Sequence, residues 1–211
     1  MIELPLFPLN TVAFPGWPMP LNIFEPRYKE LVQYCIDNKR PFGIVLIQEG
    51  AAELDTAVKP RRIGCTVEIT QVQQIEDGRY YILTVGLKRF RIMKLKRTKP
   101  YLVGEVEMLD FVEEDGALLD TAVLHLRPLV IDYFTVLANL TEEAEIDSNQ
   151  IPSDPEELGY LAAAILQVPV ETKQAFLEAR RASNLLNYLT DIYERELRII
   201  PRQDMGNFSP N

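Results

Sequence analysis

The sequence predicts an α+β fold: an antiparallel β-barrel or sandwich with one short helix, followed by a C-terminal α-helical bundle. In the first half, apolar residues fall in short β-branched runs separated by turn signals, without the strand–helix alternation of a parallel sheet. Later, apolar residues recur at three- and four-residue spacing, which is typical of helices. We therefore expect a barrel in residues 1–112, helices in 113–200 and a flexible tail in 201–211.

The first twenty residues hold five of the fifteen prolines. Because proline has no amide donor, we expect extended edge segments and turns there, and no central strand. A short helix follows, since Tyr28, Leu31 and Cys35 share one apolar face, and Pro41 ends it.

Five later segments have the composition of strands: 42–47, 64–69, 80–85, 90–95 and 102–108. Residues 48–62, between the first two, are expected to form a loop. Asp77-Gly78 predicts a hairpin turn, because this pair readily adopts positive φ. Gly86 is expected to bend or bulge the chain between two separate strands.

The second half predicts three helices. Residues 119–137 carry an apolar face at helical spacing, with Pro128 expected to kink or split it. An acidic loop is expected near 139–154. Ser153-Asp154-Pro155-Glu156 is a capping box that predicts a helix over 157–168, and a longer helix is expected from about 171 to about 199.

Charge is divided unevenly along the chain. The formal net charge of the 211 residues is −9, of which residues 1–110 contribute +2 and residues 111–211 contribute −11. The total argues against a protein built mainly to coat nucleic acid. The split indicates two differently built parts.

The expected setting is a reduced, cytoplasmic one. Only two cysteines are present, too few for a disulfide framework. The first residues lack the basic start and apolar stretch of a signal peptide, and we find no run of about 18 apolar residues that would span a bilayer. We therefore expect no transmembrane segment.

The residues that carry chemistry in enzymes are mostly absent. The single histidine, His125, lies mid-helix between two leucines, where a structural role is the usual one. No glycine is followed by lysine, so the phosphate-cradling loop of nucleotide hydrolases is missing. Cys35 and Cys65 lie in apolar patterns typical of small hydrophobes. We expect no enzymatic activity, no metal and no cofactor.

Two segments could bind a protein partner. Residues 14–21 carry the only tryptophan in a proline-rich, stiff backbone, so Trp17 and Met19 could form a pre-organised apolar surface. The alternative is that they close the open edge of the barrel. Phe24, Arg27 and Tyr28 precede or open the short helix, and the plain alternative is an ion pair of Arg27 that orders the turn.

One segment could bind nucleic acid. Seven cations and no acid lie within residues 88–99, with one interleaved aromatic residue. The alternative is a solvated strand face, or an electrostatic partner for the acidic helices. The candidate nucleic-acid-binding residues are Lys88, Arg89, Arg91, Lys94 and Lys96.

Several motifs resemble those of one family. Residues 4–9 (LPLFPL), 14–16 (FPG) and 20–28 (PLNIFEPRY) resemble the opening of the Lon protease N-terminal, substrate-binding domain. Residues 64–69 (GCTVEI), 85–92 (VGLKRFRI) and 173–178 (KQAFLE) are similar to later motifs of that family. Where the family usually has the dipeptide Gly-Thr, this chain has Gly64-Cys65-Thr66. The resemblance covers roughly residues 2–200 and is strongest to stand-alone versions of the domain.

The resemblance implies a PUA-like pseudo-barrel followed by a helical bundle, related to proteolysis but without the ATPase and peptidase domains of Lon. It implies a non-enzymatic module that binds unfolded segments or a partner protein, with a separate ATPase or protease as one conceivable partner. The alternative is an RNA-binding PUA-like protein that uses the basic strand region, which the acidity of the second half disfavours.

Overall fold

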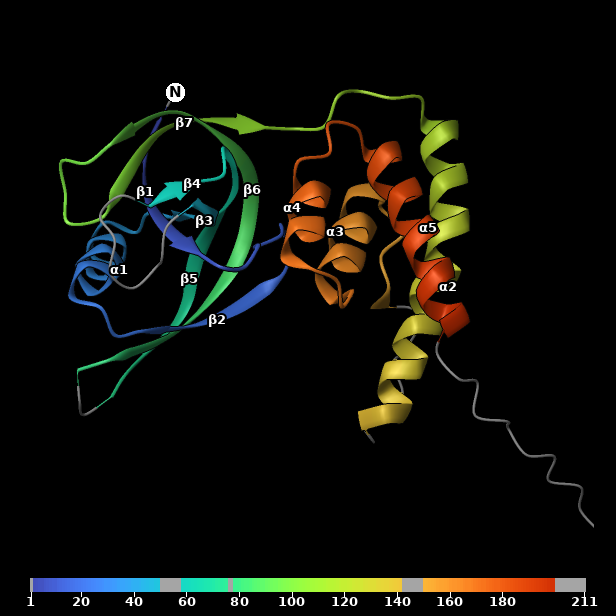
Figure 1. Cartoon of the computed structure of the whole chain (residues 1–211), viewed down its shortest axis with the longest axis horizontal. Helices are drawn as coiled ribbons and strands as arrows, with labels where there is room; N and C mark the ends of the chain where they lie inside the picture. The colour runs from blue at the N-terminus through green and yellow to red at the C-terminus, as the bar shows by residue number, and fades with distance from the viewer. Residues whose placement is uncertain (1, 50–57, 76–77, 142–149, 200–211) are drawn as a thin grey trace, which may run out of the picture.

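The computed structural model describes residues 2–49, 58–75, 78–141 and 150–199. A barrel of strands with one helix stands beside a bundle of four helices, joined by the connection from β7 to α2 (Figure 1). The strands are β1 (Ile2–Leu9), β2 (Pro18–Ile23), β3 (Phe42–Glu49), β4 (Lys59–Pro60), β5 (Ile63–Gln74), β6 (Tyr80–Lys96) and β7 (Leu102–Leu109). The helices are α1 (Pro26–Asn38), α2 (Gly116–Thr141), α3 (Pro155–Ile165), α4 (Val170–Leu177) and α5 (Ala182–Ile199). The predicted α+β class is confirmed.

The barrel closes through one parallel pairing. The strand order is β1-β7-β6-β5-β3, all antiparallel, and β1 then pairs with β3 in parallel. β4 pairs with β3 outside this ring, and β2 pairs with the first part of β6. The sheet is therefore mostly, but not wholly, antiparallel. The predicted loop over 48–62 contains the end of β3 and the two-residue β4, while the rest of it lies largely outside the described residues.

The expectation that the proline-rich start holds no central strand is wrong. β1 lies between β7, which it pairs over residues 2–6, and β3, which it pairs over residues 6–9. Pro5 and Pro8 therefore lie where β1 has only one neighbour, and a proline nitrogen can face the unpaired side. Only Leu6 has a partner on both sides.

The expectation of two separate strands is also wrong, because β6 is continuous over 17 residues. The bulge expected at Gly86 agrees with a shift of register against β5, which gives β6 one extra residue between Gly86 and Arg89. A Cβ atom at Gly86 would lie 2.0 Å from the Phe14 carbonyl oxygen. Glycine is also needed here for the close approach of another backbone segment. The predicted Asp77-Gly78 turn lies partly outside the described residues, and Gly78 has the positive φ expected of it, 75°.

The bundle differs from the predicted helices in one place. Pro128 was expected to kink or split its helix, and of these alternatives the split is wrong, since α2 is one helix with Pro128 inside it. The long helix expected over 171–199 is wrong: α4 ends at Leu177 and α5 begins at Ala182. Tertiary contacts cause this break, because Arg89 of β6 bonds to the carbonyls of Leu177 and Ala179, and the Glu114 carboxylate accepts from the Ser183 amide.

The helix predicted after the capping box is confirmed, but its cap is Asp154 instead of Ser153. The Asp154 carboxylate accepts from the amides of Glu156 and Glu157, both at 3.0 Å, and Pro155 is the first helical residue. Proline is suited to this position, since its missing donor would have no partner there.

The barrel and the bundle share one apolar core. Phe14 of the barrel and Tyr160 of α3 are both buried, and their ring centroids lie 6.5 Å apart. Phe111, on the connection between the parts, stacks on Tyr160 at 5.7 Å. The boundary predicted near residue 112 stays a prediction, although the last strand and the first bundle helix lie on either side of it.

One described helix, over Gly116–Ala138, is long and apolar enough to cross a membrane by length and composition alone. This qualifies the expectation that no such segment exists. In the fold, its Leu126, Val130 and Tyr133 are buried, and the Tyr133 ring meets that of Tyr193 of α5 edge-on at 5.1 Å. The helix thus packs by one face as a member of the bundle.

Candidate functional site

The candidate site is a cleft of about 640 Å³ between the barrel and the start of α3. Its volume falls in the range of ligand pockets, roughly 300–1,000 Å³. The barrel side consists of Pro15, Gly16, Trp17 and Leu87. The bundle side consists of Pro152, Asp154, Glu156, Glu157, Tyr160 and Leu161. We call it the Trp17 cleft.

A tight turn holds Trp17 in place. Gly16 adopts φ 73°, a conformation that favours glycine, and its amide donates to the Gly86 carbonyl at 2.9 Å. The Gly86 amide in turn donates to the Trp17 carbonyl at 3.1 Å, and the Trp17 amide donates to Phe14. Phe14 is 1% exposed, so the turn is anchored in the core. The Trp17 side chain is half-buried and forms one wall of the cleft.

The opposite wall is acidic. It begins with the Asp154 cap and continues with the exposed carboxylates of Glu156 and Glu157 in the first turn of α3. Partial burial raises the pKa of the Glu156 carboxyl, and the nearby charges of Asp154 and Asp110 raise it further, against the opposing effect of Arg89 and Lys88. The cleft lining contains no lysine and no arginine.

Arg89 fixes the two walls relative to each other. This β6 residue is 3% exposed, and its Nη1 donates to the carbonyls of Leu177, at 3.0 Å, and of Ala179. Its guanidinium lies 3.9 Å from the Phe111 ring centroid and 5.9 Å from that of Tyr160, both within the range of cation–π contacts. Arg89 of the barrel thus contacts both the end of α4 and Tyr160 on the bundle side of the cleft.

The predicted peptide-binding residues do not form one site. Trp17 lines the cleft, whereas Met19 is half-buried on β2, where its carbonyl accepts from the Thr84 hydroxyl at 2.9 Å. Phe24 is 51% exposed between β2 and α1. Arg27 and Tyr28 line a different hollow, of about 230 Å³.

Within that hollow, Tyr28 is a core residue. It is 4% exposed and its ring lies 4.0 Å from that of Phe7. Arg27 forms an ion pair with Glu25 at 2.7 Å and lies over the Tyr28 ring at 4.6 Å. This is the turn-ordering contact that the sequence left as the plain alternative.

The basic strand region is largely matched by carboxylates of the barrel itself. Lys88 pairs with Asp110 at 3.6 Å, and Arg91 with Glu107 at 3.8 Å. Hydrogen bonds with Glu105 and Glu3 raise the pKa of Lys96 to about 12. Lys94 is exposed, and Arg89 is buried in the joint described above.

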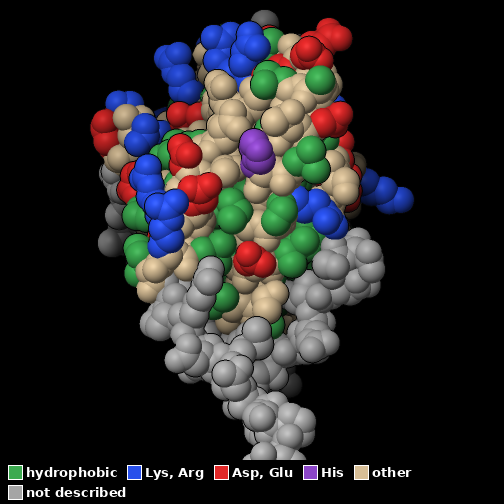
Figure 2. All heavy atoms as spheres, turned by 90° about the vertical axis from the view of Figure 1, so that its right-hand side faces the viewer, with side chains coloured by type: hydrophobic (Ala, Val, Ile, Leu, Met, Phe, Trp, Pro, Cys, Tyr) green, Lys and Arg blue, Asp and Glu red, His purple; other side chains and the backbone are tan. Residues whose placement is uncertain are grey.

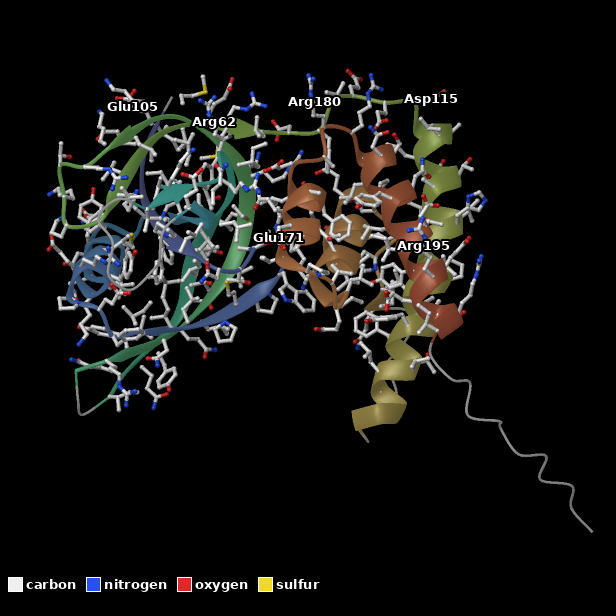
Figure 3. The ribbon with its side chains drawn as sticks, viewed as in Figure 1. Arg62, Glu105, Asp115, Glu171, Arg180 and Arg195 are labelled. Carbon is white, nitrogen blue, oxygen red and sulfur yellow. The ribbon has the colours of Figure 1, made fainter. Side chains whose placement is uncertain are left out.

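These partners are not the acidic helices. Glu105 lies on the barrel on the side away from the bundle (Figure 3). Of the five candidate nucleic-acid-binding residues, Arg89 is the one that reaches the bundle, and there it binds main-chain carbonyls. Three of the five therefore have a carboxylate neighbour and a fourth, Arg89, is buried.

The edges of the sheet differ in their capacity to pair with another strand. The Trp17 carbonyl accepts from Gly86, so in antiparallel register Pro18 and Pro20 of β2 face outward, where they offer no amide. β5 pairs with β6 along most of its length, but with β3 only over residues 65–67. Among the described residues, the side of residues 68–74 that faces away from β6 therefore has no strand partner. A second hollow, of about 330 Å³, lies between this edge and the end of α1.

The outer face of the bundle carries hydrophobic side chains scattered among charged ones, with the single histidine near its middle (Figure 2). Leu118 and Leu124 of α2 are 49% and 72% exposed. No hollow described on the molecule lies on this face of α2, which makes it a weaker candidate than the Trp17 cleft.

The thiols are poor nucleophiles. Burial raises the pKa of Cys35 and of Cys65 to about 12, so both stay protonated at neutral pH. Among the residues that the structure describes, no three His, Cys, Asp or Glu side chains are grouped in a way that could hold a metal ion.

Sequence reasoning missed Leu87, Tyr160 and the acidic wall as site residues. The capping motif signalled the start of α3, but nothing local in the sequence indicated that this helix begins opposite Trp17. Leu87 was missed because the sequence predicted a bend or bulge at Gly86 between two strands. In the structure Leu87 lies within one continuous strand, β6, which pairs with β2 and β5.

Two solved structures share this fold. The Lon N-terminal domain protein of Xanthomonas campestris matches with a TM-score of 0.62 and 24% identity, over 95% of this chain and 100% of that one. The N-terminal domain of a Mycobacterium avium complex Lon protease matches with a TM-score of 0.72 and 16% identity, over 92% and 98%. At these identities the likeness establishes the fold alone.

The family follows from the sequence comparison. Residues 3–195 match the model of the ATP-dependent protease La (LON) substrate-binding domain, and the chain belongs to this family. Relatives include the Lon proteases of Anaeromyxobacter dehalogenans, 24% identical over 199 residues, and Syntrophus aciditrophicus, 28% identical over 212 residues. Each match covers 93% of this chain but only 24% and 25% of those proteins, so the chain corresponds to about a quarter of their length.

Proposed function

We propose that this chain is a recognition module that binds unfolded segments or a partner protein through the Trp17 cleft and carries out no chemistry itself. The observation that carries the proposal is the cleft: a rigidly held tryptophan faces Tyr160 and Leu161 across a hollow of ligand size, in a member of the LON substrate-binding domain family. Pre-organised aromatic side chains lose little entropy on binding, so they suit this task.

The lack of chemistry is supported by the groups around the cleft. Its lining holds carboxylates and apolar side chains but no histidine, cysteine, serine or lysine that could act as a nucleophile or base partner. Delivery of bound clients to a separate ATPase or protease would be consistent with the Lon proteases among its relatives. The placement of the basic strand region offers no observation that favours RNA binding.

The first prediction tests the cleft with an unfolded client. Binding of a fluorescently labelled, reduced and carboxymethylated model protein is measured by anisotropy for the wild-type chain and for Trp17→Ala. We expect the variant to bind at least tenfold more weakly, because loss of a central aromatic anchor typically costs 2 kcal/mol or more, on the order of a thirtyfold change.

His125→Ala is the control, because His125 is exposed on the outer face of the bundle. It should bind as the wild type does. Wild-type affinity in Trp17→Ala, or absence of any client binding by the wild-type chain, would contradict the proposed function. Met19→Ala distinguishes a wider surface, since a loss there would extend the binding area along β2.

A further inference from the structure

The Trp17 cleft is built from two chemically different halves. Its apolar part is formed by Trp17, Leu87, Tyr160 and Leu161 together with two prolines. Its acidic part is formed by Asp154, Glu156 and Glu157. A purely apolar client would contact only the apolar part. The acidic part therefore indicates that a fitting client also carries a polar or charged group.

The negative charge of the acidic part is not neutralised internally. Asp154 is engaged by two main-chain amides, but within the described residues neither Glu156 nor Glu157 forms an ion pair. The start of α3 contributes only about half a positive charge, against three carboxylates. The wall therefore keeps a net negative potential.

The two cations nearest to Glu156 contact other groups. Lys88 and Arg89 are the positive groups that influence Glu156. Lys88 lies 3.6 Å from the Asp110 carboxylate, and Arg89 is buried with its donors on the carbonyls of Leu177 and Ala179. Neither side chain belongs to the lining of the cleft.

We propose that the Trp17 cleft selects segments in which a lysine or arginine stands beside a large apolar or aromatic residue. This inference rests on the proposed function and names the class of client. The apolar side chain would lie on Trp17 and Leu87, and the cation would approach Glu156 and Glu157. The half-buried Trp17 ring offers a second attraction for a cation. Acidic segments are rejected, because like charges repel across a partly desolvated cleft.

The chain carries its own probe for the test, because Trp17 is its only tryptophan. Three tryptophan-free peptides are titrated while tryptophan emission is recorded: acetyl-Ser-Leu-Arg-Phe-Ser-amide and the same peptide with glutamine or glutamate in place of arginine. We expect the arginine peptide to bind about five- to tenfold more tightly than the glutamine peptide, and the glutamate peptide to bind more weakly still. The preference for arginine should shrink as salt is added.

Matched variants assign the preference to the acidic wall. In Glu156→Gln/Glu157→Gln the arginine and glutamine peptides should bind alike. Glu171→Gln is the control: Glu171 is also an exposed acid in the first turn of a helix, but that helix, α4, begins beyond the far end of α3 (Figure 3). It should keep the full preference.

Two outcomes separate this proposal from the proposed function. Equal binding of the arginine and glutamine peptides to the wild type, or an arginine preference that survives in the double variant, overturns the selectivity and leaves the recognition module standing. Binding of the labelled unfolded protein but of none of the peptides also overturns it. If neither the peptides nor the unfolded protein bind, the proposed function itself fails.

Discussion

At the scale of single residues, the site depends on two contacts between segments that lie far apart in the sequence. Gly86 lets the Phe14–Trp17 turn approach β6, and Arg89 bonds the barrel to the end of α4. The sequence predicted a bend or bulge at Gly86 and a basic surface that includes Arg89. Both interpretations were local, and neither residue carries a local signal of its tertiary partner.

Substitution of Gly86 tests the close approach of the turn. In Gly86→Ala the new methyl group would meet the Phe14 carbonyl oxygen at 2.0 Å, so the turn that carries Trp17 must shift. We expect a loss of about 1–3 kcal/mol in the free energy of unfolding, the usual range for overpacking, measured by urea denaturation. Gly116→Ala is the control, since a Cβ atom there meets nothing within 4 Å. Equal stability of the two variants would refute the steric account.

Arg89 makes a stronger prediction. Arg89→Met keeps much of the side-chain length but leaves the carbonyls of Leu177 and Ala179 without their buried donor. Each hydrogen bond to a charged group contributes about 1.5–3 kcal/mol, so we expect the free energy of unfolding to fall by about 3 kcal/mol. Arg91→Met, which removes a half-exposed ion pair with Glu107, should cost less than about 1 kcal/mol. A cost for Arg89→Met no greater than this would show that the joint is held by apolar packing alone.

At the scale of elements, the start of α5 is set by a residue outside it. Glu114 has a side chain that is 1% exposed and accepts from the amide and hydroxyl of Ser183, with Arg181 3.7 Å away. Burial opposes ionisation of this carboxyl, but the hydrogen bonds from Ser183 and the charge of Arg181 outweigh it, and the pKa is lowered. The helical spacing of residues 171–199 was real, yet it could not reveal a cap supplied from residue 114.

This cap makes stability depend on pH with a definite sign. Because the folded-state pKa of Glu114 is lowered, its stabilising effect is complete above the pKa of an ordinary glutamate, about 4.3, and is lost as pH falls through the lower folded-state value. We expect Glu114→Gln to unfold about 1–3 kcal/mol more easily than the wild type at pH 7, and the difference to shrink in acid. Urea denaturation at pH 7 and below pH 4 measures this, with exposed Glu113→Gln as the control. A difference independent of pH would exclude a role for the carboxylate charge.

At the scale of the whole molecule, the order and type of the parts were predictable, because hydrophobic period changes from strand-like to helical along the chain. The motifs at residues 20–28 and 85–92 also indicated the family to which the chain belongs. The candidate site was predictable only through Trp17. Its other wall comes from α3, about 140 residues later, and no periodicity reports which helix end meets which turn.

The uneven charge of the chain has a different use from the one the sequence suggested. Lys88, Arg91 and Lys96 pair with carboxylates of the barrel, whereas Arg89 binds main-chain carbonyls of the bundle. Among the described residues, none of these four cations forms an ion pair with an acid of the bundle. The acids at the start of α3 are therefore left to face the cleft. This arrangement is what gives the proposed client preference its sign.

The pairing of β1 with β7 also governs the order in which the barrel can assemble. β1 is synthesised before the other strands of the barrel, but its antiparallel partner β7 is complete only at Leu109. Closing contacts across about a hundred residues is slow, because chain entropy is lost before those contacts form. During synthesis, the apolar face of β1 therefore stays without its full cover until β7 has been made. Until then, the nascent chain would itself expose an apolar segment of the kind that we propose as a client.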